Sequence, residues 1–350
     1  MTQTLEHEEV TVHRGSRSGL PLIIAIHSRA LGPAVGGIRL RRYGSWREGL
    51  ADALRLSEAM TYKCAASGLD FGGGKTVVAL DQHAELTPEL RAAALADLGE
   101  LIAAHEGTYY AGPDIGTTPD DMAVLRRSAP YVFCLPEEHG GTGDSGTPTA
   151  TGVLAALRAG ADHVFGTASL SGRTVIVSGY GSVGSRVAAG LAGDGARVLV
   201  SDVDESKRAA VERSGFTWLA PARIPGTPAD VLVPAAVGGV LSPETAAELD
   251  VRLVVGPANN QLTDDSVAEL LAARDIVWVP DFVASAGGVV YTLGREVDGL
   301  TREEAVRRVL GIGDTVGLLL DRSREGGTTP LAEAKSLATA RLARLAGVGR

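Results

Sequence analysis

Residues 173–192, RTVIVSGYGSVGSRVAAGLA, carry the pattern that decides the fold. Gly179, Gly181 and Gly184 form a GxGxxG motif that directly follows an apolar strand and directly precedes an Ala-rich helix. In such a motif the first glycine permits a tight turn, the second lets the backbone approach a pyrophosphate, and the third lets helix and strand pack closely. The helix N-terminus supplies amide donors for the phosphates. The stretch predicts a dinucleotide site whose turn contributes Gly179, Tyr180, Gly181, Ser182, Val183 and Gly184.

The next strand-like run, ARVLVSDVD, places Asp202 about twenty residues after the motif. An acidic side chain at this point accepts hydrogen bonds from an adenosine ribose and repels a 2′-phosphate. Asp202, with Val203 and Asp204 beside it, therefore favours NAD over NADP. The alternative is that Asp202 only caps the helix that follows.

Strand-like runs continue through the C-terminal half and alternate with helix-like segments, which predicts a parallel sheet built from βαβ units. These runs are 173–178, 197–201, 230–234, 252–255 and 275–279. The N-terminal part mixes expected strands at 21–28 and 75–80 with expected helices at 45–66 and 87–106.

A polar, Gly-rich stretch at 136–147 is the expected hinge between the two parts. We therefore predict an α/β protein with an N-terminal α/β domain at 1–135, completed by a C-terminal helix at 325–350, and a Rossmann domain at 136–324. The last helical stretches, 301–322 and 331–345, are expected to return to the first domain.

Composition excludes several classes of protein. The 350 residues are 45% hydrophobic and 21% charged, as in a globular protein. A net charge of −9 argues against nucleic-acid binding, which needs a basic surface. Cys64 and Cys134 lie far apart without metal-ligand spacing, so neither a disulfide framework nor a metal site is expected. Because we find no secretory signal and no apolar run long enough to span a bilayer, we expect a cytoplasmic protein without a membrane partner.

Candidate catalytic residues lie in MTYKCAASGLDFGGGKT, which holds Lys63 and Lys75, and in YYAGPDIGTT, which holds Asp114. The glycine run before Lys75 can bring this lysine into a confined, dehydrated site. Loss of water disfavours the ammonium form, so a lysine there can act as a base near neutral pH. Each feature alone also has a structural explanation, since most lysines are solvated and most loop aspartates cap helices or turns.

Taken together, the motifs resemble those of the amino-acid dehydrogenase family that acts on glutamate, leucine, phenylalanine and valine. In chain order they are GPAVGGIR, MTYKCA, GGGK, GPDIGTT, PEEHGGTGDS, GYGSVG, GPANNQL and PDFVASAGG. The resemblance implies an N-terminal substrate-binding and oligomerising domain and a Rossmann domain that close over a cleft. It also implies NAD-dependent oxidative deamination of an α-amino acid to a 2-oxo acid and ammonia, by a homo-oligomer that is at least a dimer.

By this resemblance, Lys75 is the general base, Asp114 exchanges protons with the departing nitrogen, and Lys63 binds the substrate α-carboxylate. Gly36 and Gly37 present their backbone to the substrate. Further cofactor contacts are expected from Ser145, Thr149, Pro234, Ala235, Ala236, Val237, Ala258, Asn259 and Asn260.

The expected substrate pocket departs from the family at Ser285, where relatives usually have an Asn that helps hold the substrate. The change reflects either drift with weaker binding or a different substrate. Glutamate-specific relatives carry a Lys where this chain has Val35, and an apolar group there leaves a distal carboxylate unpaired, so glutamate is disfavoured. Gly112, Val289 and Thr292 are the other pocket positions. We expect Gly112 to leave room for a bulky substrate and Thr292 to offer a hydroxyl.

The predicted substrate is therefore Phe, Trp or Tyr first, and Val or Leu second. Two alternatives are a specialised reductase of an imine or keto acid, suggested by Ser285, and an inactive NAD-binding homologue.

Overall fold

The computed structural model of this chain describes residues 6–346. The described residues form two compact units: unit 1 is made of residues 6–144, 292–300 and 337–346, and unit 2 is made of residues 145–291 and 301–336. The limits differ from the predicted ones at 135 and 325. One reason is that the segment after residue 135 is bonded to the 292–300 segment, since Glu296 accepts hydrogen bonds from the backbone N–H and the hydroxyl of Thr142.

Unit 1 is built on a mixed sheet with the strand order β1-β2-β4-β3-β5. The strand β2 runs antiparallel to both β1 and β4, whereas β3 lies parallel to both β4 and β5. Their bounds are β1 (Glu9–Arg14), β2 (Pro21–Ser28), β3 (Ala34–Tyr43), β4 (Gly72–Asp81) and β5 (Tyr109–Pro113). Strand β2 has the predicted limits, whereas β3 was not predicted because its glycines and arginines obscure the alternation of a strand.

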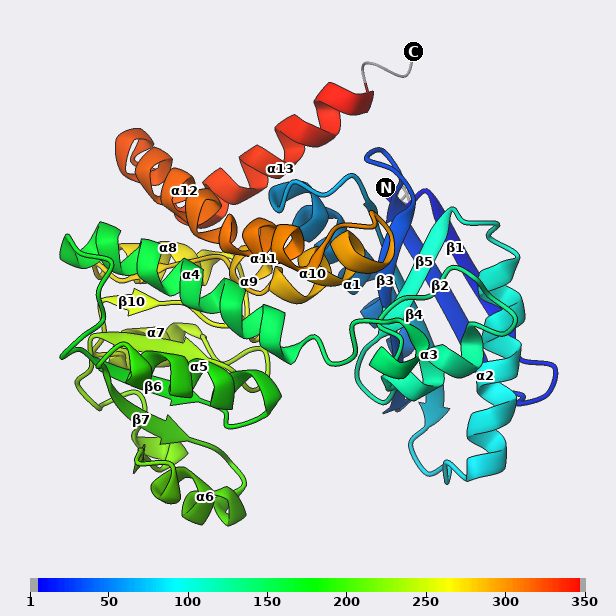
Figure 1. Cartoon of the computed structure of the whole chain (residues 1–350), viewed down its shortest axis with the longest axis horizontal. Coiled ribbons are helices and arrows are strands. Elements are labelled where there is room, and N and C mark those ends of the chain that lie inside the picture. The colour runs from blue at the N-terminus through cyan, green and yellow to red at the C-terminus, as the bar shows by residue number, and fades with distance from the viewer. Residues whose placement is uncertain (1–5, 347–350) are drawn as a thin grey trace. The chain divides into compact units, whose positions relative to one another are not determined.

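Alternate residues of β2 face two different cores, which explains its continuous apolar run. Leu22, Ile24 and Ile26 pack in the core that contains residues of α2 (Pro88–Ala103) and α3 (Pro119–Leu125), and these helices lie together over one face of the sheet (Figure 1). Ile23 and Ala25 pack with α1 (Trp46–Ala66). The Thr87 side chain accepts a hydrogen bond from the N–H of Leu90 and caps α2, whereas the Ser45 side chain makes no capping bond to α1.

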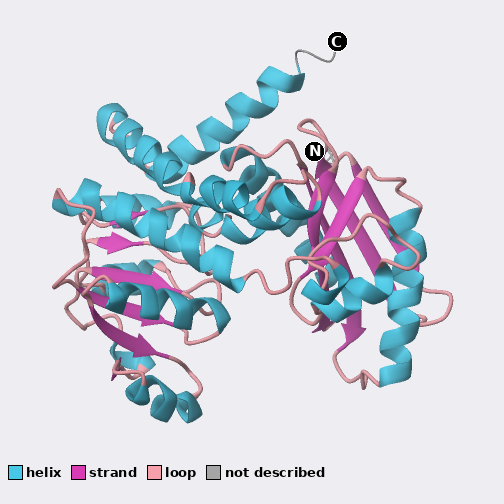
Figure 2. Cartoon of the chain, viewed as in Figure 1, coloured by secondary structure: helices cyan, strands magenta, loops and turns pink. Residues whose placement is uncertain are grey.

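Unit 2 contains a parallel sheet with the strand order β11-β10-β9-β6-β7-β8. Read from β6, this is the order of a doubly wound dinucleotide-binding fold, in which ligands bind where the order reverses, here between β6 and β9. Figure 2 shows these strands with helices alongside. Their bounds are β6 (Thr174–Ser178), β7 (Arg197–Ser201), β8 (Thr217–Trp218), β9 (Val231–Pro234), β10 (Leu253–Val254) and β11 (Val277–Trp278). The predicted α/β class is confirmed.

The remaining helices connect these strands or follow them. They are α4 (Gly146–Phe165), α5 (Ser182–Gly193), α6 (Arg208–Arg213), α7 (Pro243–Glu248), α8 (Ser266–Ala272), α9 (Asp281–Ala284), α10 (Gly287–Glu296), α11 (Arg302–Leu310), α12 (Ile312–Gly326) and α13 (Pro330–Ala346), with short 3₁₀ turns at Glu137–His139, Glu205–Lys207 and Pro221–Arg223. Within residues 6–346, no helix has both the length and the apolar character needed to cross a membrane.

The prediction that residues 301–322 return to the first domain is wrong. This stretch forms two helices, α11 and α12, and both belong to unit 2. They stay there because α12 packs on α4, where the Cδ1 of Ile312 lies 2.7 Å from the position that a Cβ on Gly152 would occupy. Of the described residues after 300, those from 337 onward belong to unit 1, where Ala338 packs with Leu31 and Ala65.

Candidate active site

Strand β4 brings Lys75 into the interior of unit 1, where only 6% of the residue is exposed. The glycines before it let the strand pass close to its neighbours. A Cβ on Gly74 would lie 2.7 Å from the ring of Tyr109, and one on Gly73 would collide with the backbone of Thr61 on α1. The glycine run therefore confines this lysine, as its sequence suggested.

The partner of Lys75 is Asp114, which directly follows β5. The Lys75 Nζ donates a hydrogen bond to Asp114 Oδ2, and Arg39 Nε donates to the same oxygen at 3.1 Å. Strand register explains the meeting, because Ile38 on β3 pairs with Pro113 on β5, so the next residues on each strand are adjacent. The Asp114 backbone is itself fixed, since its N–H donates to the hydroxyl of Thr117 at 3.0 Å.

The charges of these groups shift their proton affinities in a consistent way. Burial lowers the pKa of Lys75, and the nearby Arg39 charge lowers it further, so that together they outweigh the attraction of Asp114. Burial would raise the pKa of Asp114, but the charges of Lys75 and Arg39 outweigh it and lower this pKa to about 2. Asp114 is thus ionised at neutral pH, and Lys75 is brought toward the range in which an amine can accept a proton.

Gly37 keeps the space beside this ion pair free of a side chain. A Cβ at Gly37 would lie 2.8 Å from the Cβ of Asp114 and 3.0 Å from Lys75 Nζ. Its neighbour Gly36 lies against β4, where a Cβ would collide with the carbonyl oxygen of Gly74. Val35, on the same strand, is fully buried. The structure thus brings Gly37 together with the two predicted catalytic residues.

Lys63 is half-buried in the last turn of α1, the helix that packs against β4.

The expectation that Gly112 leaves room for a substrate needs correction. A Cβ at Gly112 would collide with the ring of Phe133, so this aromatic side chain already fills the space. The expectation that Thr292 offers its hydroxyl to the substrate also needs correction. Thr292 is fully buried, and its hydroxyl accepts a hydrogen bond from the Thr142 hydroxyl at 3.2 Å.

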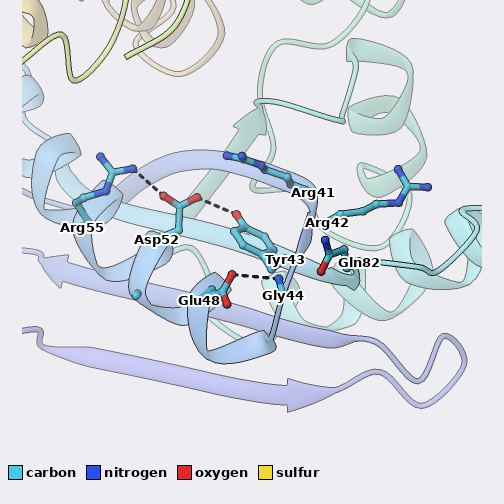
Figure 3. Close-up of a pocket in the computed structure, with 9 residues that line it drawn as sticks. Arg41, Arg42, Tyr43, Gly44, Glu48, Asp52, Arg55 and Gln82 are labelled. Atoms are coloured by element: carbon cyan, nitrogen blue, oxygen red, sulfur yellow. Dashed lines mark hydrogen bonds and ion pairs between the residues drawn. The ribbon is translucent and has the colours of Figure 1, made fainter. Parts of the chain in front are cut away.

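Arg39 continues the network toward the surface. Its Nη1 donates to Asp52 Oδ2 at 2.9 Å, and the Tyr43 hydroxyl donates to the same oxygen at 2.8 Å. Arg55 donates to Asp52 Oδ1 at 2.7 Å (Figure 3). Asp52, Tyr43 and Arg55 line an open pocket of about 840 Å³, together with Arg41, Arg42, Gly44, Glu48, Ala51 and Gln82.

Sequence reasoning missed this network. Arg39 ends the motif GPAVGGIR, so a strand arginine two residues after the paired glycines was the available signal. Asp52 and Tyr43 gave no signal in the sequence, because the hydrogen bond between them depends on how α1 packs against β3.

In unit 2 the GxGxxG turn has the geometry that its glycines predict. Gly179 has φ +118°, and a Cβ there would lie 2.7 Å from the carbonyl carbon of Ala235. A Cβ on Gly184 would collide with the carbonyl oxygen of Gly179, so helix and strand meet closely. Among the described residues, no atom beyond Gly181 and its chain neighbours lies within 4 Å of the position that a Cβ on Gly181, the N-cap residue of α5, would occupy. A pyrophosphate can therefore approach this helix end, and the turn fits the predicted dinucleotide.

Asp202 lies beside this turn and is 8% exposed. Its carboxylate accepts hydrogen bonds from the backbone N–H of Tyr180 at 2.7 Å and from Lys207 Nζ at 2.8 Å. Burial would raise its pKa, but these donors outweigh burial and lower it. The helical turn that follows is capped by Asp204, whose side chain accepts from the N–H of Ser206 at 3.0 Å. The interpretation of Asp202 as the cap of the next helix is therefore wrong.

The other predicted cofactor residues of unit 2 lie in loops near the same strand ends. Ala235, Ala236 and Val237 follow β9, and Val203 and Val237 are strongly exposed. The N–H of Ala258 donates to the carbonyl oxygen of Pro234 at 3.0 Å, which ties the GPANNQL loop to β9. Ser145 and Thr149 lie at the start of α4 against Gly288, where a Cβ would be 2.7 Å from Thr149 Oγ1.

The side chains of Gln261 and Trp278 fix the loop that holds Asn259 and Asn260. Gln261 is fully buried, donates to the carbonyl oxygens of Gly256 and Ala258 at 2.8 and 3.0 Å, and accepts from Trp278 Nε1 at 2.9 Å. Ser285 lies beside this loop, with its hydroxyl 3.4 Å from Asn259 Oδ1. Val289, four residues later on α10, is half-buried. Gln261 is a further residue that sequence reasoning did not single out.

Comparison with known proteins gives matches over both units. Residues 4–131 match the model of the Glu/Leu/Phe/Val dehydrogenase dimerisation domain, and residues 199–302 match that of Glutamate/Leucine/Phenylalanine/Valine dehydrogenase. The chain is 40% identical over 320 residues to a phenylalanine dehydrogenase of Caldalkalibacillus thermarum, covering 90% of this chain and 85% of that protein. It is 36% identical over 341 residues to a leucine dehydrogenase of Bacillus cereus, covering 97% and 92%.

Solved structures agree with these matches. The crystal structure of L-tryptophan dehydrogenase from Nostoc punctiforme matches with a TM-score of 0.81 and 31% identity, covering 97% of both chains. The Leu-bound form of a hetero-hexameric glutamate dehydrogenase from Thermus thermophilus matches with a TM-score of 0.79 and 27% identity, covering 97% of this chain and 89% of that chain.

Proposed function

Because this chain belongs to the Glu/Leu/Phe/Val dehydrogenase family and is an amino acid dehydrogenase, we propose that it catalyses NAD-dependent oxidative deamination of an apolar or aromatic L-amino acid. The observation that carries this proposal is the bond between the buried Lys75 and the half-buried Asp114 beside Gly37. An inactive homologue is not retained, since the chain is an enzyme of this family.

Each residue of the pair has a defined task. Bound NAD would supply the acceptor for the hydride that leaves the substrate Cα. Lys75 in its neutral form takes a proton from the water that adds to the resulting imine carbon. Asp114 exchanges a proton with the nitrogen, which leaves as ammonia when the carbon–nitrogen bond breaks. Lys63 binds the substrate α-carboxylate as a fixed cation. The products are the 2-oxo acid, ammonia, the reduced coenzyme and one proton.

Residues of unit 2 hold the coenzyme. The N-terminal amides of α5 bind the pyrophosphate after the turn that begins at Gly179. The carboxylate of Asp202 accepts hydrogen bonds from the adenosine ribose and repels a 2′-phosphate, which favours NAD. Asn259, Asn260 and Thr149 belong to the segments that line the nicotinamide and its ribose.

The preferred substrate is aromatic, with branched aliphatic amino acids second. Val35 supports the exclusion of glutamate, because a buried apolar side chain cannot pair with a distal carboxylate. Three of the named relatives are dehydrogenases of phenylalanine, leucine and tryptophan, at 31 to 40% identity, whereas the glutamate dehydrogenase matches at 27% identity. The match of the N-terminal unit to a dimerisation domain supports a homo-oligomer.

Substrate screening tests this proposal. Phenylalanine, tryptophan, tyrosine, valine, leucine and glutamate are each assayed with NAD and with NADP by absorbance of the reduced coenzyme. We expect the highest kcat/KM for an aromatic amino acid with NAD. Turnover of glutamate above that of every apolar amino acid would contradict the proposal.

One alternative rests on Ser285, which offers a shorter hydroxyl than the family Asn and lies beside Asn259. It is a reductase for a related imine or keto acid. Phenylpyruvate and ketoisovalerate are therefore assayed with ammonia and NADH. Fast reductive amination of either compound excludes this alternative, whereas NADH oxidation that needs no ammonia supports it.

A further inference from the structure

Arg39 is held between two carboxylates of unit 1. Its Nε donates to Asp114 at 3.1 Å and its Nη1 donates to Asp52 at 2.9 Å, so its planar guanidinium bridges the two acids. The Arg39 side chain is 12% exposed and that of Asp52 is 13% exposed. Charges with so little exposed surface act on their neighbours more strongly than a fully exposed surface ion pair does.

Asp52 is the fixed end of this bridge. It accepts hydrogen bonds from Tyr43 at 2.8 Å and from Arg55 at 2.7 Å in addition to the bond from Arg39. Burial would raise the pKa of Asp52, but Tyr43, Arg55 and Arg39 outweigh burial and lower it. Burial together with Asp52 raises the pKa of Tyr43, so this hydroxyl remains a donor. Asp52 therefore stays ionised and holds Arg39 from the side of α1.

We propose that Arg39 and Asp52 are a positioning pair that fixes the Asp114 carboxylate and sets the net charge around Lys75. This inference rests on the proposed function, because Lys75 is taken to be the base of the deamination. Arg39 orients the oxygen of Asp114 that Lys75 contacts. Asp52 compensates Arg39, so that Lys75 does not face a second, unbalanced cation.

The groups that face Lys75 determine the signs of the expected effects. The charged groups are Asp114 after β5, Arg39 on β3 and Asp52 on α1. Tyr109 on β5 faces the same region as a neutral group, because burial raises its pKa, and its hydroxyl is 2.9 Å from that of Thr76. Removing Arg39 should raise the pKa of Lys75, whereas removing the charge of Asp52 should lower it.

The opposite signs of the expected pKa shifts distinguish a positioning role of Arg39 and Asp52 from a purely structural role. If Arg39 and Asp52 only joined β3 to α1, substitution of either residue would reduce activity without moving the pH at which activity appears. If they set the charge around Lys75, the two substitutions would move that pH in opposite directions. The substrate ionises identically in assays of every variant, so its own titration does not affect the comparison.

The variants are Arg39→Gln, Asp52→Asn and the combination of the two. Because Lys75 must be neutral to act as a base, turnover rises with pH through its pKa. We expect the acidic limb of the kcat profile to move up by about one pH unit for Arg39→Gln and down by about half a unit for Asp52→Asn. The combined variant should return close to the wild type. Arg42→Gln is the matched control, since Arg42 is an exposed arginine of the same strand that donates to the carbonyl oxygen of Ala84.

A second measurement does not depend on turnover. The whole enzyme without substrate is labelled competitively with acetic anhydride over a pH series, and the extent of acetylation at Lys75 is measured by peptide mass spectrometry. The labelling pKa should shift in the same two directions. If the wild type deaminates no amino acid, the proposed function fails while this measurement still tests the positioning pair. Arg39→Lys is included in case Arg39→Gln does not fold. Because lysine retains the charge, the acidic limb of its kcat profile should lie at the wild-type pH, with a lower kcat. Shifts of the same sign, or unchanged profiles in both measurements, would overturn the inference.

Discussion

Replacement of Lys75 by Met gives the most direct test of the proposed mechanism. Lys75 is 6% exposed and is bonded to Asp114. Methionine has a similar length and no charge, so it fills the same space without a proton acceptor. General acid–base catalysis typically contributes about 10² to 10⁴ in rate, which corresponds to ~3 to 5 kcal/mol of activation free energy. We therefore expect kcat to fall by at least about 100-fold.

The substitution also changes the charge on Asp114. This carboxyl has a pKa of about 2 because both Lys75 and Arg39 face it. With Arg39 as the remaining cation, we expect the pKa of Asp114 to rise toward its ordinary value of 3.8 while Asp114 stays ionised at neutral pH. Because Arg39 still pairs with this carboxylate, the charge is not left alone, and the loss of folding stability should be below the ~3 to 5 kcal/mol typical of breaking a buried pair.

The assay combines turnover with coenzyme binding. Phenylalanine deamination is followed by reduced-coenzyme absorbance, NAD affinity by titration calorimetry, and folding by thermal melting. NAD affinity should stay unchanged, because the GxGxxG turn belongs to unit 2. Lys335→Met, which removes a partly exposed lysine of unit 2 paired with Asp265, is the control and should keep wild-type turnover. A Lys75→Met enzyme that is folded, binds NAD and retains a kcat within threefold of the wild type would refute the assignment of Lys75 as base.

Four other sites give predictions of their own. Ser285→Asn should lower KM for the amino acid by about tenfold if the serine reflects drift, because the amide adds a donor with longer reach; an unchanged KM supports a specialised substrate. Asp202→Asn should raise the ratio of NADP to NAD kcat/KM by at least about tenfold, since the carboxylate charge is lost and Lys207 remains; an unchanged ratio contradicts the role of Asp202. Phe133→Leu should increase kcat/KM for tryptophan relative to valine, because the smaller side chain opens space, and equal changes for both would contradict this. Asp97 has a pKa of about 2, since bonds to its carboxylate outweigh burial. Because this pKa is lowered, the ionised Asp97 stabilises the fold above its ordinary pKa of 3.8, and this stabilisation is lost as the pH falls toward 2. Asp97→Asn should therefore lower the free energy of unfolding, measured with urea, by about 2 kcal/mol at pH 7 and by less near pH 2. An equal loss at both pH values would contradict this.

The sequence by itself determined the features that depend on neighbouring residues of one segment. The spacing of Gly179, Gly181 and Gly184 after an apolar strand predicted the turn of unit 2, and the structure gives this turn the expected close approaches. The apolar run at 21–28 predicted strand β2 with its observed limits, and the helix expected at 87–106 corresponds to α2. Local spacing is sufficient in these cases because the interacting atoms belong to the same turn, strand or helix.

Tertiary structure alone decided the features that depend on contacts between distant segments. The bond from Arg39 to Asp114 requires the parallel register of β3 and β5, and the bond to Asp52 requires α1 to pack against β3. Likewise, the ring of Phe133 occupies the space that the bare Gly112 seemed to leave for a substrate. A glycine or an arginine in the sequence indicates only that a position leaves space or carries a charge. Which neighbour fills that space or binds that charge is set by strand register and helix packing, and these arise from the whole buried core.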